Sequence, residues 1–226
     1  MKFENTQVFN FEGAFRGMRN PKESWSKSDS EWIPTDEFQD GYRVMKYHIG
    51  ENDLKLAQTL IKAGSEHRKF MRQIFVSVDI TAPLYWWKEF DTYKVGTVSN
   101  STSTMHKLAD TPITKECFEM DDYSTDEILA GENIDDIWES ILTACEGLRQ
   151  MFNETKDKRY WKELIRLLPE SWLQKRTVTM DYENLLAMCS KGQRRFHKLT
   201  EWSESFINWA RTLPYAQELI FIDEIL

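Results

Sequence analysis

Residues 79–107 constrain the fold of this chain more than any other stretch, because a strand pattern runs directly into an aromatic helix pattern there. Aliphatic and other side chains alternate at residues 73–80, which predicts a β-strand. Thr81 is suited to capping a following helix, and Pro83 is suited to its first turn. A dense block of large rings comes next: Tyr85, Trp86, Trp87, Phe90 and Tyr93. We therefore predict a strand that leads without a linker into an aromatic helix.

Gly96 ends the aromatic block, and a cluster of small hydrogen-bonding side chains follows it. The cluster comprises Thr97, Ser99, Asn100, Ser101, Thr102, Ser103 and Thr104. Large rings beside many hydroxyl and amide groups suit a pocket that stacks a planar ring and binds its polar edge. The Asn100 amide offers both a donor and an acceptor to such an edge, and Lys94 is suited to a phosphate. The alternative is a buried helix followed by a Ser/Thr-rich loop, since aromatic stripes usually belong to the core.

A second polar segment is the basic loop at residues 15–30, which contains a glycine, a proline and four serines. It carries Arg16, Arg19, Lys22 and Lys27. Because arginine makes two-pronged contacts with phosphate, Arg16 and Arg19 are candidate phosphate ligands. The alternative is a solvated surface loop, although Trp25 counts against it because exposed tryptophan is uncommon.

The composition narrows the classes of function. A net charge of -8 disfavours general nucleic-acid binding, but it leaves room for one nucleotide in a local basic pocket. Cys117, Cys145 and Cys189 are widely spaced and form no C-x-x-C pair, so neither a disulfide framework nor a metal site is predicted. No apolar run approaches the ~18 residues of a membrane span, and the N-terminus lacks a signal-peptide core. We expect a soluble cytoplasmic protein without membrane contact.

Helix patterns outweigh strand patterns along the rest of the chain. Helices are predicted at residues 53–63, 66–71, 134–152, 158–168, 194–211 and 215–226, and further strands at 42–49 and 173–180. This order predicts an α+β protein with a mixed sheet and packed helices. No repeat or linker divides the chain, so a single domain at 1–226 is expected, with an N-terminal extension at 1–50 and a core at 51–226.

The common catalytic motifs are absent, and the four histidines lie far apart in sequence, so no catalytic residue is assigned. Three polar and basic segments remain, at residues 16–27, 93–106 and 194–198. Together with nine tryptophans they suggest a pocket for an aromatic anionic ligand, such as a nucleotide or a flavin. The candidate binding residues are Arg16, Arg19, Trp25, His67, Trp87, Tyr93, Lys94, Ser99, Asn100, Ser101, Ser103, His106, Arg194 and Arg195.

Three segments resemble the flavin-dependent thymidylate synthases over residues 50–222. R-Q-I-F-V-S-V-D-I-T-A-P-L-Y-W-W-K-E-F, at 72–90, is similar to the strand and helix that lead to that family's signature. L-L-P-E-S-W-L-Q-K-R-T-V-T-M-D-Y-E-N-L-L, at 167–186, is similar to its L-P-x-x-x-x-T strand followed by N-L. A-Q-E-L, at 216–219, is similar to its A-Q-x-E-I-R ending.

The signature itself departs from the family pattern. R-H-R-x-x-S-x-N-E-x-S-x-R-Y falls on residues 93–106, where only Asn100 and Ser103 match. Tyr93-Lys94-Val95 stands in place of R-H-R, with which the family holds flavin and deoxyuridine monophosphate. The basic loop at 16–27 is a candidate replacement for the lost charges.

The resemblance implies an α+β thymidylate synthase-like fold. It implies an enzyme that uses FAD to pass a one-carbon unit or a hydride to dUMP or a similar pyrimidine nucleotide. It also implies a homo-oligomer, with a tetramer favoured, because the sites of the family lie between subunits. The alternative is a non-catalytic nucleotide-binding or structural protein that retains the fold.

Overall fold

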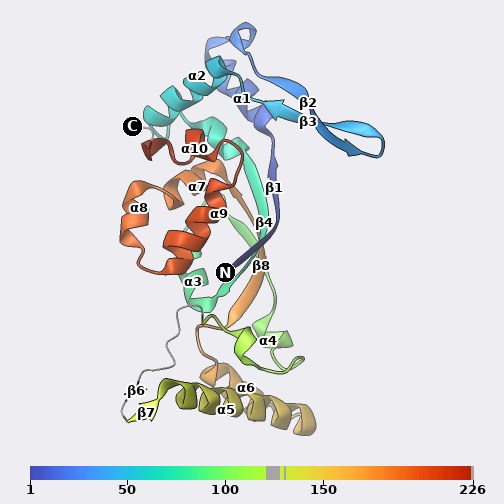
Figure 1. The fold of residues 1–226 in the computed structure, drawn as a ribbon, viewed down its shortest axis with the longest axis vertical. Coiled ribbons are helices and arrows are strands. Elements are labelled where there is room, and N and C mark those ends of the chain that lie inside the picture. The colour runs from blue at the N-terminus through green and yellow to red at the C-terminus, as the bar shows by residue number, and fades with distance from the viewer. Residues whose placement is uncertain (121–127, 130, 225–226) are drawn as a thin grey trace. The chain divides into compact units, whose positions relative to one another are not determined.

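The computed structural model describes residues 1–120, 128–129 and 131–224, without the side chains at 105 and 106. The described residues form two compact units, and the chain passes between them several times (Figure 1). Unit 1 comprises Met1–Phe3, Asp79–Thr92 and Ser99–Thr177, and unit 2 comprises Glu4–Val78, Tyr93–Val98 and Val178–Leu226. Both units draw on distant parts of the sequence.

The main sheet has four strands in the order β1–β4–β8–β5. They are β1 (Lys2–Phe9), β4 (Phe75–Pro83), β8 (Leu173–Asp181) and β5 (Val98–Ser101). Along the chain, β1 and β8 pass from unit 1 into unit 2, whereas β4 and β5 pass from unit 2 into unit 1. Neighbouring strands therefore run in opposite directions. The α+β class is confirmed, and the expected mixed sheet is corrected to an antiparallel one.

The predicted junction between strand and aromatic helix is present, with shifted boundaries. Alternate residues of β4 are buried, as the sequence pattern predicts, and the strand continues to Pro83. Thr81 is therefore a strand residue, and Pro83 occupies the N-cap position of α3 (Leu84–Phe90). α3 buries Trp86 and Trp87, so this part of the aromatic block belongs to the core of unit 1.

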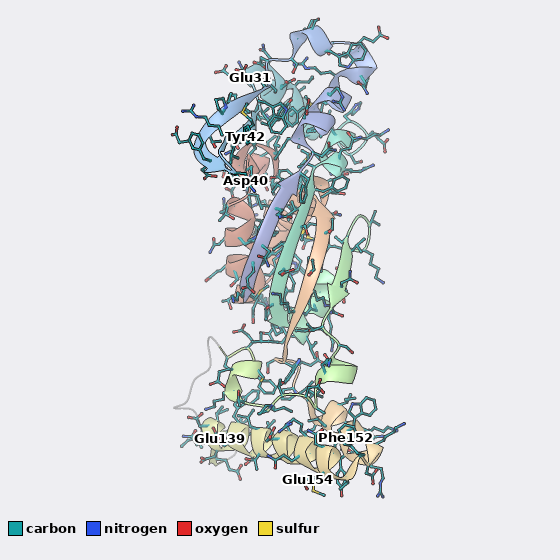
Figure 2. The ribbon with its side chains drawn as sticks, turned by 90° about the vertical axis from the view of Figure 1, so that its right-hand side faces the viewer. Glu31, Asp40, Tyr42, Glu139, Phe152 and Glu154 are labelled. Atoms are coloured by element: carbon teal, nitrogen blue, oxygen red, sulfur yellow. The ribbon has the colours of Figure 1, made fainter. Side chains whose placement is uncertain are left out.

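The strand expected at 42–49 is present and forms one arm of a β-hairpin in unit 2, whose other strand the sequence does not predict. The hairpin pairs β2 (Glu31–Gln39) with β3 (Tyr42–His48), and Figure 2 labels Asp40 and Tyr42 at its turn. Asp40 and Gly41 have φ values of 50° and 82°, the left-handed pair that a two-residue hairpin turn requires. The register shifts between Pro34 and Phe38, so the pairing of β2 is irregular there. Buried and exposed residues do not alternate along β2, so its sequence does not show a strand pattern.

Besides the hairpin, unit 2 contains helices and short helical turns. α1 (Phe11–Arg19) occupies part of the segment predicted as a loop. Its buried residues are Ala14, Phe15, Met18 and Arg19. The sequence does not indicate this helix, because Gly13 and Gly17 weaken its helical pattern. The other elements are the 3-10 turns η1 (Asn20–Lys22), η2 (Trp25–Lys27), η3 (Lys69–Gln73) and η6 (Ile222–Glu224), the π-helix η5 (Glu201–Phe206), and the helices α2 (Glu51–Lys62), α7 (Tyr182–Met188), α8 (Lys191–Phe196), α9 (Ile207–Arg211) and α10 (Ala216–Leu219).

Unit 1 is built around a long helix, α5 (Ile134–Thr155), on which Figure 2 labels Glu139, Phe152 and Glu154. α5 packs against α6 (Lys158–Leu167) over a core of Leu108, Ile113, Phe118, Leu142, Cys145 and Leu164. The remaining elements are α4 (Thr104–Lys107), the 3-10 turn η4 (Lys115–Cys117), and the short antiparallel pair β6 (Ile128–Leu129) and β7 (Glu132–Asn133). Within the described ranges, no helix is long and apolar enough to cross a membrane.

Glu146 ties α5 to the preceding loop of unit 1. Its carboxylate accepts hydrogen bonds from Arg149 Nε at 2.7 Å, Arg149 Nη2 at 2.6 Å, Gln150 Nε2 at 2.9 Å and the Ile113 N–H at 2.9 Å. The bonds from Arg149, followed by those from Ile113 and Gln150, lower the pKa of Glu146 to about 2. A carboxyl with a depressed pKa stabilises the fold above its unfolded pKa of 4.5, and this contribution is lost as the pH falls towards about 2.

We expect Glu146→Gln to lower the free energy of unfolding at pH 7 by about 1–3 kcal/mol, the scale for charge-assisted hydrogen bonds. The variant should also lose less stability than the wild type between pH 4.5 and about 2. Urea unfolding at several pH values measures both effects. Glu163→Gln is the matched control, since Glu163 and Arg166 form an exposed i,i+3 pair on α6. Equal effects of the two substitutions would contradict the prediction.

Candidate functional site

Unit 2 contains a cavity of about 1200 Å³, which we call the basic cavity. It is lined by the end of α1, the loop after it, one face of α2 and the segment that leads into η3. The lining residues are Gly17, Met18, Arg19, Asn20, Pro21, Lys22, Glu23, Ser24, Ser26, Lys27, Asn52, Leu56, Thr59, Leu60, Glu66, His67, Lys69, Phe70 and Gln73. Two residues predicted separately from the sequence, Arg19 and His67, thus line the same cavity.

A buried carboxylate, Asp53 on α2, holds the loop of the basic cavity in place. Its Oδ1 accepts a hydrogen bond from Arg19 Nε at 2.5 Å. Its Oδ2 accepts bonds from the hydroxyls of Ser28 and Ser30, each at 2.5 Å. The Asp53 side chain is fully buried, and that of Arg19 is 5% exposed. We call this group of four residues the Asp53 knot.

Arg19 also closes the loop through its other nitrogens. Nη1 donates to the Ser24 carbonyl at 3.3 Å, and Nη2 donates to the Lys27 carbonyl at 3.0 Å. The guanidinium that was a candidate phosphate ligand is therefore already engaged with a carboxylate and two carbonyls. In this arrangement Arg19 shapes the wall of the basic cavity. The sequence does not indicate its ion pair, because Asp53 lies 34 residues away.

Asp29 fixes the start of α2 beside the knot. Its carboxylate accepts hydrogen bonds from the N–H groups of Asn52 at 2.9 Å and Asp53 at 3.1 Å. These two N–H groups lack partners within the helix, and Gly50 at the N-cap has no side chain to offer. The bond from Asn52, followed by that from Asp53, lowers the pKa of Asp29. A Cβ at Gly50 would lie 2.2 Å from the Asp29 carboxyl carbon, so glycine allows this close approach.

The residues that line the basic cavity carry more positive than negative charge. Lys22, Lys27 and Lys69 line it together with His67, and all four side chains are exposed. Glu23 and Glu66 are the lining carboxylates, and the charge of Arg19 is balanced by Asp53. Within a chain of net charge -8, this is a local basic surface suited to an anionic ligand.

The two other predicted residues of the basic loop are placed outside the cavity lining. Arg16 is exposed on α1. Trp25 is 49% exposed, and its indole N–H donates to Asn20 Oδ1 at 2.9 Å, so it braces the loop. Neither residue is among those that line the basic cavity.

Tyr93, a predicted stacking residue, lies in an aromatic stack of unit 2. Its ring lies on Trp202 with 5.5 Å between centroids, and Trp202 lies on His197 with 4.1 Å between centroids. One face of Tyr93 is therefore covered by protein. Lys94, next in sequence, is exposed.

Trp87, the other predicted stacking residue, is a core residue of unit 1. Its indole N–H donates to the Gln174 carbonyl at 3.0 Å, and the guanidinium of Arg176 lies 4.2 Å from its ring centroid. With 1% exposure the ring cannot reach a ligand without unfolding α3, so the role expected for it is corrected to a packing role. For Trp87, the alternative interpretation of a buried helix therefore describes the structure better than a ligand pocket does.

The polar cluster after Gly96 forms an exposed edge of unit 1. Ser99, Asn100 and Ser101 lie on β5, and all three are exposed. Ser103 comes after β5 and is half-buried. Its carbonyl accepts a hydrogen bond from the N–H of Lys107. His106 falls within α4, but its side chain lies outside the described part of the structure. None of these residues lines the basic cavity.

In the basic segment at 194–198, Arg194 makes structural contacts and Arg195 is exposed. Arg194 donates to the carbonyl of Cys189 and to Asp223 Oδ1 at 3.1 Å, and it pairs with Glu224 at 3.2 Å. Arg195 is exposed on α8. The segment therefore secures the C-terminal turn η6, and it is not part of the basic cavity.

Sequence reasoning missed Lys69 as a lining residue of the basic cavity. It also placed a helix at 66–71, whereas the structure has a turn around His67 and the 3-10 turn η3. The available signal was the basic run R-K-F-M-R at 68–72, which follows the glycine that ends α2. This run contributes Lys69 to the cavity and buries Phe70 and Met71 beneath it.

The described chain is similar in fold to solved flavin-dependent thymidylate synthases. A ThyX structure from Helicobacter pylori, complexed with FAD and dUMP, matches with a TM-score of 0.66 and 16% identity, covering 99% of both chains. A second Helicobacter pylori ThyX structure with FAD and dUMP matches with a TM-score of 0.65 and 14% identity, covering 99% of this chain and 98% of that one. No family model matches the chain, and no curated protein sequence matches it significantly. The expected thymidylate synthase-like fold is thereby confirmed.

Proposed function

We propose that this chain is a flavin-dependent, thymidylate synthase-like enzyme that acts on a pyrimidine nucleotide, dUMP or a close analogue. The observation that supports this most is the fold, which it shares along almost the whole chain with two structures that hold FAD and dUMP. At 16% and 14% identity, the ligands that bind depend on this chain's own residues.

The basic cavity fits a ligand that combines a planar ring with phosphate. Its volume of about 1200 Å³ lies above the ~300–1,000 Å³ of most ligand pockets, so it has room for a dinucleotide such as FAD. Lys22, Lys27 and Lys69 would hold phosphate groups, and Leu56 and Phe70 would line the space for a ring. When bound, FAD supplies the hydride, and the residues of the chain bind and orient the ligands.

Asn100 and its neighbours on β5 remain our proposed contacts to the pyrimidine edge. Their amide and hydroxyl groups offer both donors and acceptors, and they are exposed in the single chain. A second subunit that covers β5 would desolvate them, so we propose a homo-oligomer, with a tetramer favoured. A mass several times that of one chain, measured by light scattering, is the result that this requires.

A non-catalytic nucleotide-binding protein is the second candidate. Two observations favour it: Tyr93-Lys94-Val95 stands where the family signature has R-H-R, and Arg19 and Arg194 are both engaged in ion pairs. Both candidates share the fold and differ in whether flavin is bound and product is formed.

Ligand binding to the purified protein tests the proposal. We expect flavin absorbance near ~450 nm, calorimetric binding of dUMP, and formation of a methylated nucleotide. The double variant Lys27→Ala/Lys69→Ala should raise the Kd for FAD at least ~10-fold, since one charge-assisted bond contributes about 1.5–3 kcal/mol. Lys55→Ala/Lys62→Ala, on α2 but outside the cavity lining, is the matched control.

The outcomes separate the two candidates. Binding of dUMP without flavin or turnover would support the non-catalytic protein. Absence of binding for both FAD and dUMP at millimolar concentration would reject the proposal in either form. Equal effects of the two lysine pairs would place the site outside the basic cavity.

A further inference from the structure

A second cavity of unit 2 has a volume of about 560 Å³, and we call it the hairpin pocket. It is formed by β1, the start of α1, the β2–β3 hairpin and residues 212–215. It shares no lining residue with the basic cavity, so the proposed function makes no use of it. Its volume falls within the ~300–1,000 Å³ range of small-molecule sites.

Aromatic rings form the walls of the hairpin pocket. Trp32 meets Tyr47 edge to face with 5.4 Å between centroids, and Phe11 meets Tyr215 in the same way at 5.6 Å. Trp32 is 50% exposed, which leaves ring surface open to a stacking partner. Burial raises the pKa of Tyr47, and the Glu12 carboxylate adds to this rise, so the wall is partly shielded from water.

The hairpin pocket also contains one group of each charge. Glu12 Oε2 accepts a hydrogen bond from the Trp32 indole N–H at 3.3 Å, so its carboxylate lies beside the open ring. Lys46, on β3, is exposed and lines the same pocket. Among the residues that the structure describes, no ion pair joins Glu12 or Lys46 to another side chain. Both charges are therefore available to a ligand.

Tyr215 lines the pocket in a conformation that large side chains rarely adopt. Its φ of 54° is left-handed, which crowds the Cβ against the following carbonyl. The tyrosine hydroxyl accepts the Ile49 N–H at 2.9 Å, and its ring edge contacts Phe11. Strained residues of this kind concentrate at ligand-binding sites, where the surrounding structure holds them in place.

We propose that the hairpin pocket binds a mononucleotide whose base presents adjacent N–H donors, a guanine nucleotide such as GMP. A carboxylate only accepts hydrogen bonds, so Glu12 matches the ring N–H and amino group of guanine. Adenine presents a ring acceptor beside its amino group and would oppose the carboxylate. The base stacks on Trp32, and Lys46 takes the phosphate.

Calorimetry on the full chain with GMP, AMP and guanosine tests this proposal. We expect GMP to bind at least ~10-fold more tightly than AMP, and Glu12→Gln to remove most of that preference. Lys46→Ala should weaken GMP to the affinity of guanosine. Trp32→Leu should weaken every ligand, and Trp32→Phe should restore most of the affinity. Trp25→Leu is the matched control, since Trp25 is 49% exposed and lies outside this pocket.

Two further measurements keep the site distinct from the basic cavity. GMP should bind unchanged to Lys27→Ala/Lys69→Ala and in the presence of saturating FAD. Loss of GMP binding in that variant, equal affinity for GMP and AMP, or no binding at millimolar GMP would each overturn the proposal. Melting temperatures of the Glu12 and Lys46 variants within a few degrees of the wild type exclude unfolding as the cause.

Discussion

Replacing Asp53 with alanine is expected to lower the free energy of unfolding by about 3–5 kcal/mol, the scale for breaking a buried ion pair from one side. The substitution leaves the Arg19 guanidinium, which is 5% exposed, without its carboxylate. It also removes the acceptor of the Ser28 and Ser30 hydroxyls. Urea unfolding of the wild type and the variant at pH 7 measures the loss.

The same turn of α2 provides the control for this prediction. Glu51 pairs with Lys55 at 3.4 Å, but the two side chains are 88% and 73% exposed. Glu51→Ala should therefore change the free energy of unfolding by less than about 0.5 kcal/mol. If Asp53→Ala proves as mild as Glu51→Ala, the carboxylate is not buried in the Asp53 knot and the loop of the basic cavity is held in another way.

The Asp53 knot also shows why the sequence alone does not reveal the structural contacts of Arg19. A basic residue in a loop with glycine, proline and serine has the same local pattern whether it binds a phosphate or a carboxylate of its own chain. The deciding partner, Asp53, is 34 residues away, and no local rule connects the two. His67 could be proposed as a site residue, but its position beside the basic loop depends on the packing of η3 against α1.

Other parts of the fold were predictable because they depend on local periodicity. The alternation in β4 and the 3.6-residue period of α5 report which face of each element is buried, and both elements appear where predicted. β2 lacks such a period, and its pairing is irregular between Pro34 and Phe38. α1 contains two glycines, which weaken its helical pattern. Trp87 was interpreted as a stacking residue because an aromatic side chain has the same appearance in sequence whether it lines a pocket or fills a core.

Gly96 is the residue of the predicted polar stretch at which substitution is expected to cost most. Its φ is 81°, and a Cβ there would lie 2.8 Å from Asp181 Oδ2 and 2.9 Å from Asn184 Oδ1. These two atoms cannot simply move away. Asp181 and Asn184 form the capping box of α7, and Asn184 Nδ2 also donates to the Val95 carbonyl at 2.6 Å.

We therefore expect Gly96→Ala to lower the free energy of unfolding by about 2–4 kcal/mol. The left-handed backbone accounts for about 1–2 kcal/mol, and disturbing the cap of α7 accounts for about 1–2 kcal/mol more. Gly41→Ala separates the two contributions, because Gly41 has a φ of 82° and no atom within 4 Å of its added Cβ. Denaturant unfolding should show Gly96→Ala as clearly the more damaging substitution. Equal losses of unfolding free energy for the two substitutions would contradict a contribution from the capping box. Only the left-handed backbone conformation would then require glycine at position 96.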